Sequence, residues 1–221
     1  MAKQGLSESI QDYLKKLYHL QTGDGRVSVT ALAREQHVSP ASASAMVKKL
    51  GALGLVEHAP YRGVLLTPAG EKVAVEVIRH HRLLELYLKE ALGLSWDQVH
   101  AEAERLEHYL SDEVEARIDA ALGYPTRDPH GDPIPTAELV LETGERRTLV
   151  DVAAGDAAVV RRVPDSDPEL LRYLADLGLV PECPVVMIEQ APFEGPVTLE
   201  IGGATHSIGR SVAARIEVMA S

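Results

Sequence analysis

The order of the segments between residues 27 and 67 constrains the fold most. Residues 27–38 and 39–54 each carry the spacing of a short helix, and the second starts with a serine cap followed by proline. A tight turn joins them, as in a helix-turn-helix. Two β-prone runs, 55–58 and 63–67, follow at once and bracket a turn, which predicts a β-hairpin. Helix, helix and hairpin in this order indicate a winged helix-turn-helix.

Further helices are expected on both sides of this unit. Residues 7–21 have apolar side chains three and four apart and predict an amphipathic helix. After the hairpin, the pattern predicts a long helix over 67–91, a helix over 95–110 that starts with a capping box, and another over 111–123. Residues 123–136 are rich in proline and suit neither helix nor strand. We therefore predict a linker and a domain boundary there.

The remaining residues change to short β-prone runs separated by turns. A single helix is expected near 169–178, and the runs around it suggest a small five-stranded barrel of SH3-like type. The predicted fold class is mainly α with a small β part. It divides into a winged helix-turn-helix domain at 1–70, a helical domain at 71–136 and an SH3-like domain at 137–221.

Composition agrees with a globular protein that does not enter a membrane. The chain is 45% hydrophobic and 25% charged, and it has no apolar run long enough to span a bilayer and no signal-peptide pattern at its start. Cys183 is the only cysteine, so no internal disulfide can form. We expect a cytoplasmic protein with no membrane partner.

Charge is distributed unevenly along the chain. The formal net charge is −11. Residues 1–70 nevertheless hold eight Lys and Arg against five Asp and Glu, and the remainder holds fourteen against twenty-eight. Such asymmetry is typical of chains with one segment that faces nucleic acid. The acidic excess elsewhere needs a separate cause, and metal binding is one.

Acidic and imidazole side chains recur at helical spacing in the predicted helices. Spacings of three and four place side chains on one face of a helix, and carboxylates mixed with imidazoles are suitable ligands for a divalent first-row metal. The candidate ligands are Asp12, His81, Glu85, His100, Glu104, Glu107 and His108. The same spacings also occur on the solvated faces of acidic helices, so spacing alone leaves both interpretations open.

The motifs of the chain resemble the diphtheria toxin repressor and manganese transport regulator family of metal-dependent repressors. The resemblance covers residues 1–136 closely, and the tail is similar to the SH3-like domain of iron-type members. It is carried by QDYLKKLYHL, VSPASASAMVKKLGALGLV, YRGVLLTPAGEKVA, RHHRLLELYL, VHAEAERLEHYLSDEVEARI and GDPIP, in the family's order.

The resemblance implies two metal sites, and hence two ions per subunit. The primary site would use Asp12, Glu104, Glu107 and His108, and the ancillary site His81, Glu85 and His100. Family members also draw a ligand from the SH3-like domain, for which Asp165, Asp167 and Glu169 are equal candidates.

The resemblance also bears on which metal is sensed. Iron-type members have Met and Cys where this chain has Asp12 and Glu104, and hard oxygen ligands favour Mn²⁺. Manganese-only regulators, however, have a second acid where this chain has Lys15, and His100 with the C-terminal domain resembles the iron type. We therefore expect Mn²⁺ as the co-repressor, with Fe²⁺ as the alternative.

The family implies a homodimer that binds double-stranded DNA at a palindromic operator through the winged domain. The candidate contacts lie on the second helix of the helix-turn-helix and on the wing: Ser39, Ser42, Ser44, Lys48, Lys49 and Arg62. Ser39 is also a helix cap. The small side chains nearby favour recognition of DNA shape over direct base contacts.

The expected function is therefore a manganese-responsive repressor of metal-uptake genes. An iron-responsive repressor and a winged-helix regulator with an organic effector remain as alternatives. A dimetal oxidase would need two Glu-x-x-His motifs, and Arg105 occupies the position three before His108. No catalytic motif stands out, so we do not expect an enzyme. The tail also lacks an aromatic peptide groove, which disfavours an adaptor, since Phe193 is the only phenylalanine.

Overall fold

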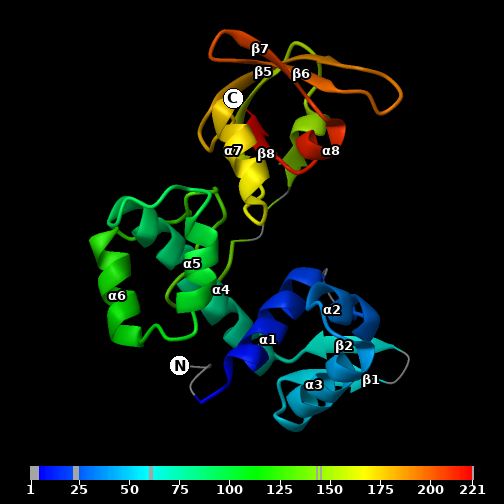
Figure 1. Ribbon diagram of the computed structural model, residues 1–221, viewed down its shortest axis with the longest axis vertical. Coiled ribbons are helices and arrows are strands. Elements are labelled where there is room, and N and C mark those ends of the chain that lie inside the picture. The colour runs from blue at the N-terminus through cyan, green and yellow to red at the C-terminus, as the bar shows by residue number, and fades with distance from the viewer. Residues whose placement is uncertain (1–4, 22–24, 60–61, 143, 145, 221) are drawn as a thin grey trace.

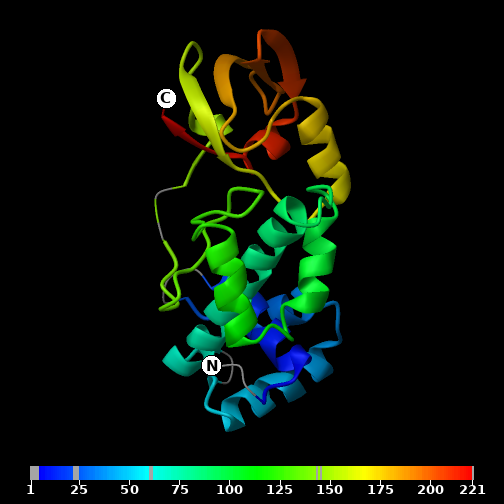
Figure 2. The same cartoon turned by 90° about the vertical axis from the view of Figure 1, so that its left-hand side faces the viewer.

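The computed structural model describes residues 5–21, 25–59, 62–142, 144 and 146–220. The described chain forms three units in sequence order: an N-terminal unit of three helices and a two-stranded sheet, a helical unit, and a β-rich C-terminal unit. The β-rich unit lies at the top of the molecule and the other two lie below it (Figures 1 and 2). The prediction of a mainly α fold with a small β part is confirmed. Among the described residues, no helix has the length and apolar character needed to cross a membrane.

The N-terminal unit is the predicted winged helix-turn-helix. It consists of α1 (Glu8–Leu20), α2 (Val29–Glu35), α3 (Pro40–Ala52), β1 (Val56–Ala59) and β2 (Gly63–Leu66). The strands pair antiparallel and form the wing; residues 60–61 of the predicted turn lie outside the described residues. Leu14, Leu32 and Leu50, one from each helix, are fully buried in a common core. Ser39 caps α3 as expected, because its side chain accepts from the backbone of Ser42.

The helical unit contains α4 (Pro68–Glu90), α5 (Val99–Leu106) and α6 (Asp112–Ala121). The predicted helix over 95–110 is shorter in the structure, because residues 96–98 form a turn and no side-chain cap bond is present at Gln98. At its other end α5 stops at Leu106, residues 107–109 form a turn, and Ser111, the cap of α6, has an extended backbone. This end matters for function, since Glu107 and His108 follow α5 directly.

The C-terminal unit is an SH3-like antiparallel sheet, as predicted, but it has six strands in the order β3-β8-β4-β5-β6-β7 where five were expected. The sixth strand is β3, a two-residue strand whose sequence continues into a 3-10 turn. The elements are β3 (Arg147–Thr148), η1 (Leu149–Asp151), β4 (Ala157–Arg162), α7 (Pro168–Asp176), β5 (Pro184–Gln190), β6 (Val197–Ile201), β7 (Ala204–Ile208), α8 (Arg210–Ala213) and β8 (Glu217–Ala220).

The proline-rich segment, for which we predicted a linker, is packed against α4 and the C-terminal sheet. Arg79 and Arg82 on α4 donate to the backbone oxygens of Pro135 and Pro133, at 2.6 and 2.5 Å. Gly131 has φ +91°, and a Cβ there would lie 1.9 Å from the Arg161 oxygen of β4. Only glycine fits this close approach. The segment is thus clamped between α4 and the C-terminal sheet.

Candidate metal centres

The first cluster joins α1 to the end of α5. Asp12 Oδ1 lies 3.2 Å from Nε2 of His108, and that nitrogen lies 3.7 Å from Oε1 of Glu107. Nδ1 of His108 is hydrogen-bonded to the side-chain oxygen of Gln11 at 3.0 Å, which orients the ring so that Nε2 faces Asp12. Asp12 is half-buried and Glu107 is 1% exposed. We call Asp12, Glu107 and His108 the primary centre; their ligand atoms lie within 4.8 Å of one another.

Lys15 lies beside this centre, one turn after Asp12 on α1. Its Nζ donates to both carboxylate oxygens of Glu107, at 2.8 and 2.7 Å, and lies 3.3 Å from Nδ1 of His81. Burial opposes the charge of Glu107, but the hydrogen bond from His81 and the charge of Lys15 lower the pKa of Glu107 to about 2. Glu107 is therefore a carboxylate at neutral pH.

The second cluster connects α4, α5 and the C-terminal unit. Oε1 of Glu85 lies 3.0 Å from Nε2 of His81 and 2.9 Å from Nδ1 of His100, and Asp165 Oδ2 lies 3.7 Å from the same nitrogen of His100. We call His81, Glu85, His100 and Asp165 the ancillary centre. Burial would lower the pKa of His81, but Glu85 and Glu107 raise it to about 9.

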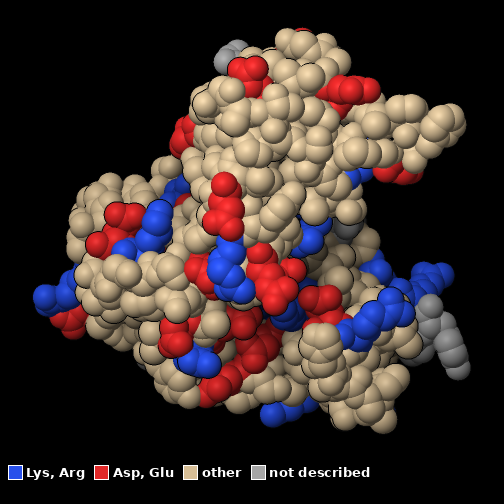
Figure 3. Space-filling view, turned by 45° about the horizontal axis from the view of Figure 1, so that its top comes forward, with Lys and Arg blue, Asp and Glu red and all other residues tan. Residues whose placement is uncertain are grey.

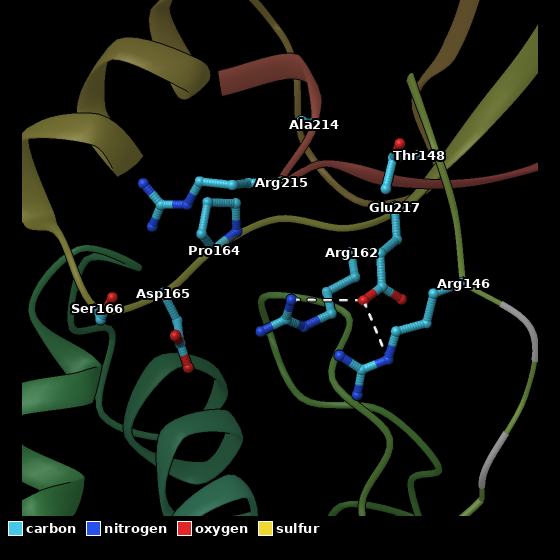
Figure 4. A pocket seen from close by; sticks show the side chains of 9 residues that line it. All are labelled: Arg146, Thr148, Arg162, Pro164, Asp165, Ser166, Ala214, Arg215 and Glu217. Carbon is cyan, nitrogen blue, oxygen red and sulfur yellow. Dashed lines mark ion pairs between the residues drawn. The ribbon is translucent and has the colours of Figure 1, made fainter. Parts of the chain in front are cut away.

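Asp165 distinguishes itself from the other C-terminal candidates by its position. Figure 4 shows its carboxylate turned toward the helices below, while Arg146 and Arg162 reach Glu217 on the far side of the same pocket. Asp167 caps α7 by accepting from the backbone of Glu169 and Leu170, at 3.0 and 3.2 Å. Glu169 is exposed. Of the three candidates, the structure brings only Asp165 to the ancillary centre.

A third cluster was not predicted and lies against the second. Glu85, Asp128 and His130 are buried, and Glu85 Oε2, Asp128 Oδ2 and His130 Nδ1 lack a hydrogen-bond partner among the described residues. His130 Nδ1 lies 3.6 Å from Glu85 Oε2. Burial and the charges of Glu85 and Asp132 raise the pKa of Asp128, and burial opposes but Glu85 raises that of His130 to about 9. Buried polar atoms without a hydrogen bond are costly, and the ligand atoms of Glu85, Asp128 and His130 lie within 4.8 Å of one another, so this donor set fits a bound cation.

Acidic side chains are also conspicuous on the surface. Figure 3 shows Asp and Glu gathered in the middle of one face with Lys and Arg among them. Carboxylates in such numbers attract cations from solution.

The sequence of the chain matches known protein families over most of its length. Residues 5–64 match the family described as the iron dependent repressor, N-terminal DNA binding domain, and residues 67–136 match its metal binding and dimerisation domain. Residues 147–220 match the FeoA domain. The iron-dependent repressor IdeR of Mycobacterium tuberculosis is 34% identical over 210 residues, which is 90% of each chain. The chain belongs to the iron-dependent repressor family. It is thus a metal-dependent transcriptional repressor, as the sequence predicted.

Other similar proteins have descriptions that name different metals or none. The diphtheria toxin repressor of Corynebacterium efficiens is 39% identical over 185 residues, 79% of this chain and 80% of that protein. A solved manganese-dependent transcriptional repressor in complex with manganese is 41% identical, with a TM-score of 0.87 over 96% of this chain and 100% of that one. ScaR with bound Zn²⁺ is 33% identical, with a TM-score of 0.80 over 96% and 99%.

The structure brings all the predicted metal ligands except Glu104 into the primary or the ancillary centre. Glu104 does not join Asp12 in the primary centre: its side chain is 47% exposed, and its Oε1 lies 3.8 Å from Nε2 of His100. Asp128 and His130 were missed because the prolines around them suggested a linker. A signal was present, since two aspartates and a histidine within five residues are unusual ligand-type density for a linker.

Five of the six predicted DNA-binding residues are exposed, and the exception is Ser44. Ser42, Lys48 and Lys49 on α3 are exposed, as is Arg62 beside the wing. The hydroxyl of Ser44 is half-buried and donates to the backbone oxygen of Pro40 at 2.8 Å. Ser44 is therefore less free to contact DNA than the lysines.

Proposed function

We propose that this repressor is a manganese-responsive regulator of metal-uptake genes that binds a palindromic operator as a homodimer. The observation that carries the proposal is the primary centre, in which Asp12 of the DNA-binding unit lies with Glu107 and His108 of the dimerisation unit. Its donors are oxygen and nitrogen only, with no thiolate or thioether. Such hard donors suit Mn²⁺, while Fe²⁺ remains the alternative, as the descriptions of the relatives also allow.

The proposal assigns two ions to each subunit. Asp12, Glu107 and His108 hold the first, and Glu104, whose side chain is 47% exposed, is proposed as a further ligand of that ion. His81, Glu85 and His100 hold the second, with Asp165 as the ligand from the C-terminal unit. Asp128 and His130 lie on the other oxygen of Glu85 and extend this second centre into the clamped segment.

The residues act by linking parts of the chain. A metal ion supplies coordination bonds that hold Asp12 to Glu107 and His108, and so hold α1 to the dimerisation unit. Because α1 is packed in the winged domain, its position sets where α3 stands relative to the partner subunit. That link would favour the spacing of the two α3 helices that matches the operator half-sites. Asp165 ties the C-terminal sheet to the same core.

On the DNA side, we propose that Lys48, Lys49 and Arg62 contact phosphates, and that Ser39 and Ser42 lie at the groove edge. Their exposure on α3 and the wing supports this role. Ser44 contributes through the shape of the helix surface, since its hydroxyl is bonded to Pro40. Few direct base contacts are expected, so DNA shape should carry much of the specificity.

The test is operator binding titrated separately with Mn²⁺ and Fe²⁺ under anaerobic conditions. We expect wild type to bind DNA with either ion, with Mn²⁺ at least as effective, and Asp12→Ala to lose the metal dependence. Asp112→Ala removes an exposed acid on α6 and is the matched control. Unchanged metal dependence in Asp12→Ala would refute the role of the primary centre. A response to Fe²⁺ with silence at saturating Mn²⁺ would leave only the iron alternative, and binding indifferent to both ions would favour an organic effector.

A further inference from the structure

Trp96 connects the C-terminal unit to a proposed metal ligand. It is the only tryptophan of the chain and lies in the turn that precedes α5. Its side chain is half-buried and packs against the hydrophobic core of the C-terminal unit. Its backbone oxygen accepts a hydrogen bond from Nε2 of His130 at 2.9 Å, and the centroids of the two rings lie 5.5 Å apart. The proposed function uses His130 but gives Trp96 no role.

The backbone oxygen of Trp96 determines which nitrogen of His130 is available to a metal ion. A carbonyl oxygen only accepts hydrogen bonds, so Nε2 of His130 carries the hydrogen. The other nitrogen, Nδ1, lies 3.6 Å from Oε2 of Glu85 and within 4.8 Å of an oxygen of Asp128. A hydrogen bond at one imidazole nitrogen fixes the orientation in which the other nitrogen coordinates a metal ion. The orientation of His130 therefore depends on the position of the Trp96 carbonyl.

The C-terminal unit holds this turn and His130 at further points. NH1 of Arg172 on α7 lies 2.8 Å from Oδ2 of Asp97, the residue after Trp96. The backbone nitrogen of Val163, which is buried in the same core, donates to the backbone oxygen of His130 at 2.9 Å. Nε1 of the indole is buried without a hydrogen-bond partner among the described residues. Apolar packing rather than a hydrogen bond therefore holds the indole against the C-terminal core.

We propose that Trp96 is a positioning residue that makes metal binding at the third cluster depend on docking of the C-terminal unit against the helical unit. In the docked state the C-terminal core holds the indole, and the carbonyl of Trp96 orients His130. When the C-terminal unit separates, the turn loses this support and His130 loses its orientation. By linkage, the ion in turn favours the docked state. The inference rests on the proposed function, since it assumes an ion bound at the third cluster.

The first test changes the indole and measures Mn²⁺ affinity by isothermal titration. Trp96→Ala removes the contact with the C-terminal core, so Mn²⁺ should bind the third cluster about tenfold more weakly. The ion of the primary centre should keep its affinity, and titration of Asp12→Ala identifies which ion that is. Trp96→Phe keeps an apolar ring and should recover most of the affinity. Tyr173→Ala removes an aromatic side chain that is 41% exposed on α7 and is the matched control.

Three results of this titration would overturn the inference. They are wild-type affinity at the third cluster in Trp96→Ala, an equal loss of affinity at both centres, and no recovery in Trp96→Phe. An equal loss at both centres would mean that the indole only supports the fold.

The second test leaves Trp96 unchanged and decides the question if Trp96→Ala does not fold. Trp96 is the only source of tryptophan fluorescence, and quenching by acrylamide measures how accessible the indole is to solvent. Because the ion favours the docked state, Mn²⁺ should reduce acrylamide quenching in wild type and in Asp12→Ala but not in His130→Ala. Quenching that Mn²⁺ does not change in wild type, or that it reduces equally in His130→Ala, would show that docking and metal binding are independent.

The two proposals fail in different ways. If wild type neither binds Mn²⁺ nor shows metal-dependent operator binding, the proposed function is wrong whatever the Trp96 variants do. If wild type does both, but Trp96→Ala matches it in Mn²⁺ affinity and Mn²⁺ leaves acrylamide quenching unchanged, only the role of Trp96 is wrong.

Discussion

Replacing Glu107 with glutamine should destabilise the metal-free protein strongly. The carboxylate is 1% exposed and accepts both contacts from Lys15, at 2.7 and 2.8 Å, in addition to its bond with His81 at 2.5 Å. Glu107→Gln keeps the shape of the side chain and removes its charge. The buried cationic groups of Lys15 and His81 would then lie close together without the anion between them, and an unpaired buried charge is costly.

The pKa of Glu107 gives the size of the effect. A shift from 4.5 to about 2 corresponds to about 3 kcal/mol of stability at neutral pH. Removing one partner of a buried ion pair costs about 3–5 kcal/mol in other proteins, which agrees. For a protein of this size, the unfolding midpoint should fall by about 6–12 °C.

The assay is thermal unfolding in the presence of a chelator, from pH 3 to pH 8. Because the folded pKa is depressed, the stabilisation is present above about pH 4.5 and is lost as the pH falls toward 2. The difference between wild type and Glu107→Gln should therefore be largest at pH 7 and should fall to roughly half of that at pH 3, since the folded pKa lies below this pH. Glu113→Gln, at an exposed pair with Arg117, should change the midpoint little. A difference between wild type and Glu107→Gln that is small at pH 7, or that stays constant down to pH 3, would refute the reasoning.

Three further predictions concern the metal centres and the DNA-binding surface. Metal affinity should rise with pH up to about 9, because His81 and His130 have pKa values near 9 and must each lose a proton to coordinate a metal ion. Isothermal titration in two buffers of different ionisation enthalpy would detect the released protons, and the absence of proton release would count against these ligands. Asp12→Met with Glu104→Cys should shift operator binding toward Fe²⁺ in an anaerobic titration, and an unchanged metal preference would contradict the ligand assignment. Lys48→Ala should weaken binding to all sequences and reduce the salt slope by about one, whereas a change at a single base pair would indicate direct base contact.

Local signals in the sequence were sufficient for most of the helices and for the wing. Ser39 and Thr67 each precede a proline, and both cap the helices that begin there. These signals act through neighbouring residues, so they survive without knowledge of the rest of the fold. The helix predicted from Ser95 begins only at Val99, because residues 96–98 of the expected capping box form a turn and no side-chain cap bond is present at Gln98.

The sequence by itself determined the fold class, the family and the types of donor atom, since these depend on local spacing and on motifs read in order. Only the tertiary structure decided how the donors are grouped. Helical spacing placed Glu104 with Glu107, yet the side chain stands apart, because residues on one face of a helix can still turn to different neighbours. The proline-rich composition of the segment that contains Asp128 and His130 predicted a linker. In the structure, contacts from Arg79, Arg82 and β4 bury this segment. These partners are distant in the chain, so no local sequence pattern contains them.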